Sequence, residues 1–94
     1  MENYPLIKVT LLPDVIVEEL ENEAVLLNTK TEHYFGLDSS GLRFWQLLET
    51  TKNSADMVAS LLTEYKVDEP TLQRDVAKFI IELDNAGLVT IEKD

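Results

Sequence analysis

Few side chains in this sequence could support acid–base or metal chemistry. His33 is the single histidine, and a general base or metal ligand normally needs an orienting carboxylate or further ligands beside it. The sequence identifies no such partner, so we interpret His33 as a structural or surface residue. The chain has no cysteine, which excludes disulfides, thiolate metal sites and cysteine nucleophiles. No metal site is therefore predicted.

The densest acidic group lies in a short segment that contains Glu18, Glu19, Glu21 and Glu23. A calcium loop of the EF-hand type needs a fixed spacing of acidic residues that is absent here. The chain also lacks a glycine-rich phosphate loop and the Gly-x-Ser-x-Gly pattern of hydrolases. We interpret the glutamates as a solvated rim, and the sequence predicts neither catalysis nor a cofactor.

Trp45, together with Phe44 and Leu48, could form a platform for a ligand. An aromatic residue at helical spacing within an apolar stripe is, however, more often part of the core. We therefore assign Trp45 to the core.

The charge balance is strongly acidic, with 18 Asp and Glu residues against 8 Lys and Arg and a net charge of -10. Binding to nucleic acid depends on lysines and arginines that displace counterions from phosphates. A winged-helix DNA-binding regulator would need a basic recognition helix, whereas residues 69–86 set Arg74 and Lys78 against four acidic side chains. The composition favours a protein or peptide partner over nucleic acid.

The length of 94 residues, 45% of them apolar, fits one domain. We expect residues 1–12 to form an N-terminal arm or an extra strand, and residues 13–94 to form a single domain. The start of the chain has no basic leader with a long apolar run, and no apolar run approaches the roughly 18 residues of a membrane span. A cytoplasmic protein, a monomer or weak dimer, is expected.

Three strands are predicted in the first half of the chain. Val15–Leu20 and Glu23–Asn28 flank a turn at Glu21–Asn22, where asparagine tolerates a positive φ. A second turn leads to His33–Leu37, whose aromatic residues favour a half-buried pleated surface. The pattern predicts an antiparallel meander.

Three helices are predicted after the strands, because the apolar period changes from two to helical. The first should begin at Asp38–Ser40 and end near Thr50–Thr51, and the second should be capped by Asn53 or Ser54. In the second, one apolar stripe is expected from Val58, Leu61, Leu62 and Tyr65.

The third helix has clear boundary signals. Asp68 is its expected N-cap, Pro70 lies in its first turn, and Gly87 followed by Leu88 predicts a Schellman ending. Its apolar face comprises Leu72, Val76, Phe79, Ile80 and Leu83. The elements together predict an α+β fold with a three-stranded antiparallel meander followed by three helices.

The third strand of such a meander is an edge. Its unpaired backbone N–H and C=O groups could pair with another extended segment, and the following helices could form the second wall of a groove. Phe35→Pro is expected to remove an edge N–H and to abolish such pairing. The pattern indicates peptide binding by strand addition.

The order of the residues resembles that of PqqD-like proteins. The resemblance rests on Leu26-Leu27-Asn28, Thr31, Tyr34-Phe35-Gly36-Leu37-Asp38, Gly41, Trp45 and Leu47-Leu48, and later on Tyr65-x-Val67, Arg74-Asp75-Val76, Phe79, Leu83 and Gly87-Leu88. It covers about residues 13 to 91. It implies a small winged-helix-like domain that serves as a RiPP precursor peptide recognition element. Such a domain is non-catalytic, binds the leader of a ribosomally made peptide and presents the peptide to modifying enzymes.

In this family the leader adds beside the third strand and lies against the third helix. Carried onto this sequence, the resemblance implies a peptide site made of Glu32, His33, Tyr34, Phe35, Gly36 and Leu37 on one side and of Arg74, Asp75, Lys78, Phe79 and Glu82 on the other, with Val25 and Leu27 as its floor.

One departure bears on the pathway. Pyrroloquinoline quinone proteins usually have Pro-Glu after the Leu-Leu string, and this chain has Asn28-Thr29. The chain looks more like stand-alone domains of lasso-peptide systems, where a leader peptidase and a cyclase act. A PqqD-type chaperone for a radical SAM enzyme stays open as the alternative.

Overall fold

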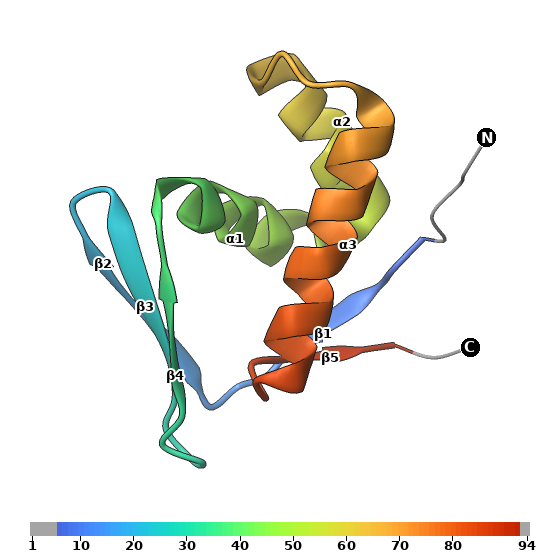
Figure 1. Ribbon diagram of the computed structural model, residues 1–94. Helices are drawn as coiled ribbons and strands as arrows, with labels where there is room; N and C mark the ends of the chain where they lie inside the picture. Colours follow the sequence, from blue (N-terminus) through green and yellow to red (C-terminus); the bar gives the residue numbers. More distant parts are fainter. Residues whose placement is uncertain (1–5, 93–94) are drawn as a thin grey trace.

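The computed structural model describes residues 6–92, which form a three-stranded sheet, three helices and a separate two-stranded ribbon (Figure 1). The elements in chain order are β1 (Val9–Leu11), β2 (Val15–Leu20), β3 (Glu23–Asn28), β4 (Tyr34–Leu37), α1 (Ser39–Thr51), α2 (Ser54–Glu64), α3 (Glu69–Asn85) and β5 (Val89–Ile91). No helix among these residues is long and apolar enough to cross a bilayer.

The larger sheet is the predicted meander, with the antiparallel order β2-β3-β4. The predicted α+β architecture, a meander followed by three helices, is confirmed. In the first turn Glu21, with φ 56°, takes the left-handed conformation that was expected of Asn22. The expectation for Asn22 is therefore wrong.

The N-terminal segment, residues 1–12, was expected to form an arm or an extra strand. Residues 1–5 lie outside the described part of the chain, and Val9–Leu11 form a strand of the smaller sheet. β1 pairs antiparallel with β5, so that Val9 lies opposite Ile91 and Leu11 opposite Val89. Val9 and Val89 are buried, and this ribbon lies beside the end of α3 (Figure 1). The two ends of the domain are thus joined to each other.

The helices begin at side-chain caps. Asp38, Asn53 and Asp68 each accept a hydrogen bond from the backbone N–H three residues later, which satisfies an otherwise unpaired donor of the first turn. Of the two caps considered for the second helix, the structure has Asn53.

The end of α3 is the predicted Schellman motif. Gly87 has φ 77°, its N–H donates to the Asp84 carbonyl at 3.1 Å, and the Leu88 N–H donates to the Leu83 carbonyl at 2.9 Å. Leu88 is buried against the last turn, so the chain turns sharply into β5.

The core lies between the sheet and the helices. Ala24, Leu26 and Leu37 face α1, where Trp45 is 3% exposed, as expected of a core residue. The buried face of α3 is the predicted one, except that Phe79 is only half-buried.

The predicted stripe of α2 is partly wrong. Met57, Val58 and Leu61 are buried, whereas Leu62 and Tyr65 are each 37% exposed. The helix ends at Glu64, so Tyr65 is extended and leaves the helical face.

Candidate functional site

β4 is an edge strand, and the hydrogen bonds of its hairpin determine which of its groups are free. The Asn28 N–H donates to the His33 carbonyl at 2.8 Å across the loop between β3 and β4. Along an antiparallel strand the backbone N–H and C=O groups of successive residues point alternately toward one neighbouring strand and away from it. Phe35 therefore bonds to β3, while the N–H and C=O groups of Tyr34 and Gly36 point away from β3. Tyr34 and Gly36 therefore provide the free backbone edge.

This register corrects the expectation for Phe35→Pro. The Phe35 N–H lies on the β3 side of β4, opposite Leu26, so a proline there would disrupt the hairpin itself. Leu37 is oriented the same way and is 5% exposed, so neither its N–H nor its side chain is available to a ligand. The expected contact of Leu37 with a peptide stays a prediction, and the free domain does not expose this side chain.

The two faces of β4 are distinct. Opposite residues of neighbouring strands share a face, and the register pairs Leu27 with Tyr34 and Val25 with Gly36. These four residues lie on the outer face, away from the helices, and Tyr34 is 77% exposed. Val25 and Leu27 were expected to form the floor of the peptide site. Because side chains alternate between the two faces of a strand, both lie on the outer face of the sheet, and their contact with a peptide stays a prediction.

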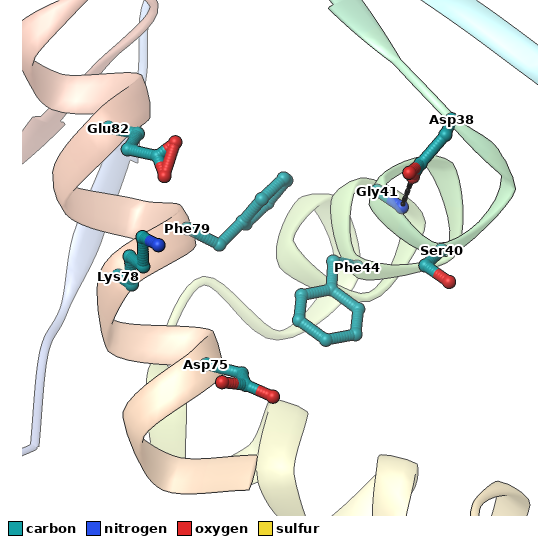
Figure 2. Close-up of a pocket in the computed structure, with 8 residues that line it drawn as sticks. All are labelled: Asp38, Ser40, Gly41, Phe44, Asp75, Lys78, Phe79 and Glu82. Carbon is teal, nitrogen blue, oxygen red and sulfur yellow. Dashed lines mark hydrogen bonds between the residues drawn. The ribbon is translucent and has the colours of Figure 1, made fainter. Parts of the chain in front are cut away.

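A groove of about 250 Å³ lies between α1 and α3 (Figure 2). Its lining comes from the start of α1 and from one face of α3: Asp38, Ser40, Gly41 and Phe44, and Asp75, Lys78, Phe79 and Glu82. Asp38 directly follows β4, so the groove adjoins the free edge of the sheet.

Two aromatic rings form the apolar part of the groove. Phe44 and Phe79 meet edge to face with their centroids 5.4 Å apart and an interplanar angle of 80°. Both rings project into the space between α1 and α3 (Figure 2) and are half-buried. They offer an apolar contact surface that is closed on the core side.

The groove continues beyond these rings. A second hollow of about 210 Å³ shares Ser40, Phe44 and Asp75 with the first and is also lined by Leu72, Tyr65 and Val67. The combined groove therefore runs along α3 from Glu82 to the segment before the helix.

The polar lining of the first hollow is acidic. Asp38, Asp75 and Glu82 contribute carboxylates and Lys78 the one ammonium group. Arg74 does not line the groove. It is exposed and lies 3.9 Å from the Asp75 carboxylate, which makes it a flanking charge. The groove suits a segment that combines apolar side chains with a cationic one.

Asn28 connects the strand side of the site to the helix side. Its side-chain Nδ2 donates to the Gly87 carbonyl at 2.8 Å, and its Oδ1 accepts the N–H groups of Lys30 and Thr31. The residue is 5% exposed. It therefore fixes the loop before β4 against the end of α3.

The structure brings together some of the predicted site residues and separates others. Asp75, Lys78, Phe79 and Glu82 line one groove, and Tyr34 and Gly36 form the adjoining free edge. Glu32, with φ 66°, and His33 are exposed in the loop before β4. Within residues 6–92 no cluster of three or more acidic, histidine or cysteine side chains is placed to hold a metal.

Sequence reasoning did not assign the α1 side of the groove or the segment between α2 and α3 to the site. These residues are Asp38, Ser40, Gly41, Phe44, Tyr65, Val67 and Leu72. The one available signal was the aromatic pair, since Phe44 lies just outside the stripe that Leu42, Trp45 and Leu48 form.

Comparison with known proteins gives one family and two solved structures. The profile described as "Coenzyme PQQ synthesis protein D (PqqD)" matches residues 23–89. The structure "TbiB1 in Complex with the TbiA(beta) Leader Peptide" is 38% identical, with 90% of this chain and 99% of that chain covered and a TM-score of 0.83. "Lasso peptide synthetase B1 complexed with the leader peptide" is 26% identical, with coverages of 87% and 96% and a TM-score of 0.78. No curated protein matches the sequence.

Proposed function

This chain belongs to the PqqD family, and we propose that it binds the leader segment of a ribosomally synthesised precursor peptide without catalysing a reaction itself. The two solved relatives support this proposal, because both are described as complexes with a leader peptide and both align over nearly the whole domain. The bound precursor would be delivered to the enzymes that modify it.

The observation that carries the proposal is the free edge of β4 beside the groove of α1 and α3. A peptide in extended conformation can pair with the N–H and C=O groups of Tyr34 and Gly36. Its alternate side chains then face the helix side, where Phe44 and Phe79 and three carboxylates line the groove. Backbone pairing supplies affinity for any extended segment, and the groove supplies selectivity.

A lasso-peptide pathway, with a leader peptidase and a cyclase as the receiving enzymes, agrees best with the relative described as a lasso peptide synthetase B1. A chaperone for a radical SAM peptide-modifying enzyme is the second candidate, because the matching family is described as a coenzyme PQQ synthesis protein. The genes beside this one distinguish the two candidates: a peptidase and a cyclase favour the first, a radical SAM enzyme the second.

DNA binding is disfavoured by electrostatics. The groove face of α3 carries Asp75 and Glu82, and the chain has a net charge of -10. A recognition helix of this sign would be repelled by phosphates.

The test is a titration of the fluorescein-labelled leader of the precursor peptide encoded beside this gene, followed by fluorescence anisotropy. We expect a dissociation constant in the micromolar range or below, which corresponds to about -8 kcal/mol or better. A leader of the same composition in scrambled order is the control. Absence of binding at tens of micromolar, or equal binding of the scrambled peptide, would contradict the proposal.

A further inference from the structure

Gly36 occupies the middle of a short edge strand, where glycine carries a cost. A glycine in a strand loses more conformational freedom on folding than other residues and contributes no side chain to pack. Such a glycine normally has a structural reason: a positive φ, a bulge, or a neighbour too close for a Cβ atom.

None of these three reasons applies to Gly36. Among residues 6–92 the glycine with positive φ is Gly87, not Gly36. The register of β3 and β4 runs without a skipped residue from Leu27–Tyr34 to Ala24–Leu37, so there is no bulge. A Cβ atom built on Gly36 would meet nothing within 4 Å. The isolated domain therefore gains nothing from a glycine at this position.

The space left open at Gly36 has apolar surroundings on the outer face of the sheet. Val25 lies directly opposite Gly36 on β3, and Tyr34 and Leu27 form the neighbouring pair. The row continues to Ile16 on β2, which lies opposite Leu27 and is 51% exposed. No heavy atom of the neighbouring strands lies within 4 Å of the position that a Cβ atom would take on Gly36.

We propose that Gly36 and Val25, with the Tyr34 ring beside them, form a subsite on the outer face that receives a bulky apolar side chain of the bound leader. This inference rests on the proposed function. Gly36 directs its N–H and C=O groups away from β3, so a residue of an added strand pairs with it directly. The side chain of that residue shares the outer face with Gly36 and can lean across it onto Val25.

The leader would then be selected on two faces at once. The residue opposite Gly36 faces outward to the subsite, and its immediate neighbours along the strand face inward to the groove of Phe44 and Phe79. The chemical class of the ligand is thus an extended segment in which a large apolar residue lies between residues suited to the acidic, aromatic groove.

The experiment replaces Gly36 and measures folding and binding separately. Gly36→Val is expected to keep or raise the melting temperature, because a β-branched residue suits a strand and meets no neighbour. The same variant should bind the fluorescein-labelled leader encoded beside this gene at least about tenfold more weakly, because the valine methyl groups fill the subsite. Thr90→Val, at an exposed position of β5, is the matched control and should leave the affinity unchanged.

An alanine scan of the leader against both proteins identifies the residue that enters the subsite. Alanine at one bulky apolar position of the leader should lower the affinity for the wild-type domain about tenfold. The same alanine substitution should not lower the affinity for Gly36→Val any further. If the wild-type domain binds the leader and Gly36→Val binds it equally, with an unchanged alanine profile, the subsite is refuted and the proposed function stands. If the wild-type domain does not bind the leader, both fail.

Discussion

The free N–H of Tyr34 allows strand addition to be tested with little effect on the fold. Tyr34 is the first residue of β4, and its N–H points away from β3. Proline lacks this N–H and is tolerated at the start of an edge strand. Tyr34→Pro should therefore remove one donor from the free edge and leave the pairing of β3 with β4 in place.

The size of the effect follows from the number of free groups. Tyr34 and Gly36 offer one N–H and one C=O each to an added strand. Loss of the Tyr34 N–H removes one hydrogen bond and leaves a leader carbonyl unpaired, which costs about 1–3 kcal/mol. The leader should bind about 5- to 150-fold more weakly. The free energy of unfolding should fall by less than about 1 kcal/mol, because the lost donor faces solvent in the free domain.

The assay combines leader titration by fluorescence anisotropy with thermal denaturation followed by circular dichroism. Tyr34→Ala is the matched control, because it removes the ring and keeps the N–H. Phe35→Pro is the contrasting variant and should destabilise the domain by about 2 kcal/mol or more, since it removes a bond within the hairpin. If Tyr34→Pro binds the leader as tightly as Tyr34→Ala does, the leader does not pair with this edge.

Three further predictions concern the groove, the loop anchor and a pH effect. Phe79→Ala removes one ring of the edge-to-face pair and should weaken leader binding roughly tenfold. Ile81→Ala, on the exposed side of α3, is the control and should change the affinity less than about twofold. Equal effects of the two substitutions would argue against the groove as the leader site. Asn28→Ala deletes three hydrogen bonds of a buried side chain. It should lower the free energy of unfolding, measured by urea denaturation, by about 2–4 kcal/mol. A loss below about 1 kcal/mol would show that the Asn28 side chain is unimportant for holding the loop before β4. Hydrogen bonding from Arg43 lowers the pKa of Glu64, so this pair stabilises the fold above the ordinary carboxylate pKa and loses that contribution as pH falls through the lowered value. The stability difference between wild type and Glu64→Gln should therefore be small at pH 7, under about 1 kcal/mol for an exposed pair, and should shrink as the pH falls through the lowered Glu64 pKa. A difference that stays constant from pH 7 into the acid range would refute the assignment.

Local signals predicted most of the fold. The three N-caps, the helical periods and the Gly87–Leu88 ending depend on residues within a few positions of each other, and the structure has them as expected. The pairing of β1 with β5 joins segments about 80 residues apart in sequence, and nothing in either short segment specifies its partner. Similarly, the exposure of Leu62 depends on how α2 packs against α1 and α3.

The candidate site was less predictable than the fold, because it too depends on contacts that local sequence signals do not specify. The edge strand and the α3 face followed from the strand order and the resemblance, but the directions of the β4 N–H groups depend on the Asn28–His33 hydrogen bond. Shifting that bond by one residue would exchange the free and paired groups. Tyr65 and Val67 line the groove because α2 ends at Glu64, earlier than its apolar pattern indicates.

Hydrogen exchange at the individual amides of β4 tests the central claim most directly. In the free domain the amides of Tyr34 and Gly36 should exchange rapidly and that of Phe35 slowly, because of these three residues only Phe35 directs its N–H toward β3. At saturating leader, the exchange rates of the Tyr34 and Gly36 amides, measured by NMR, should fall by a factor of about ten or more. Leader binding that leaves both amides exchanging at their free rates would contradict strand addition to β4.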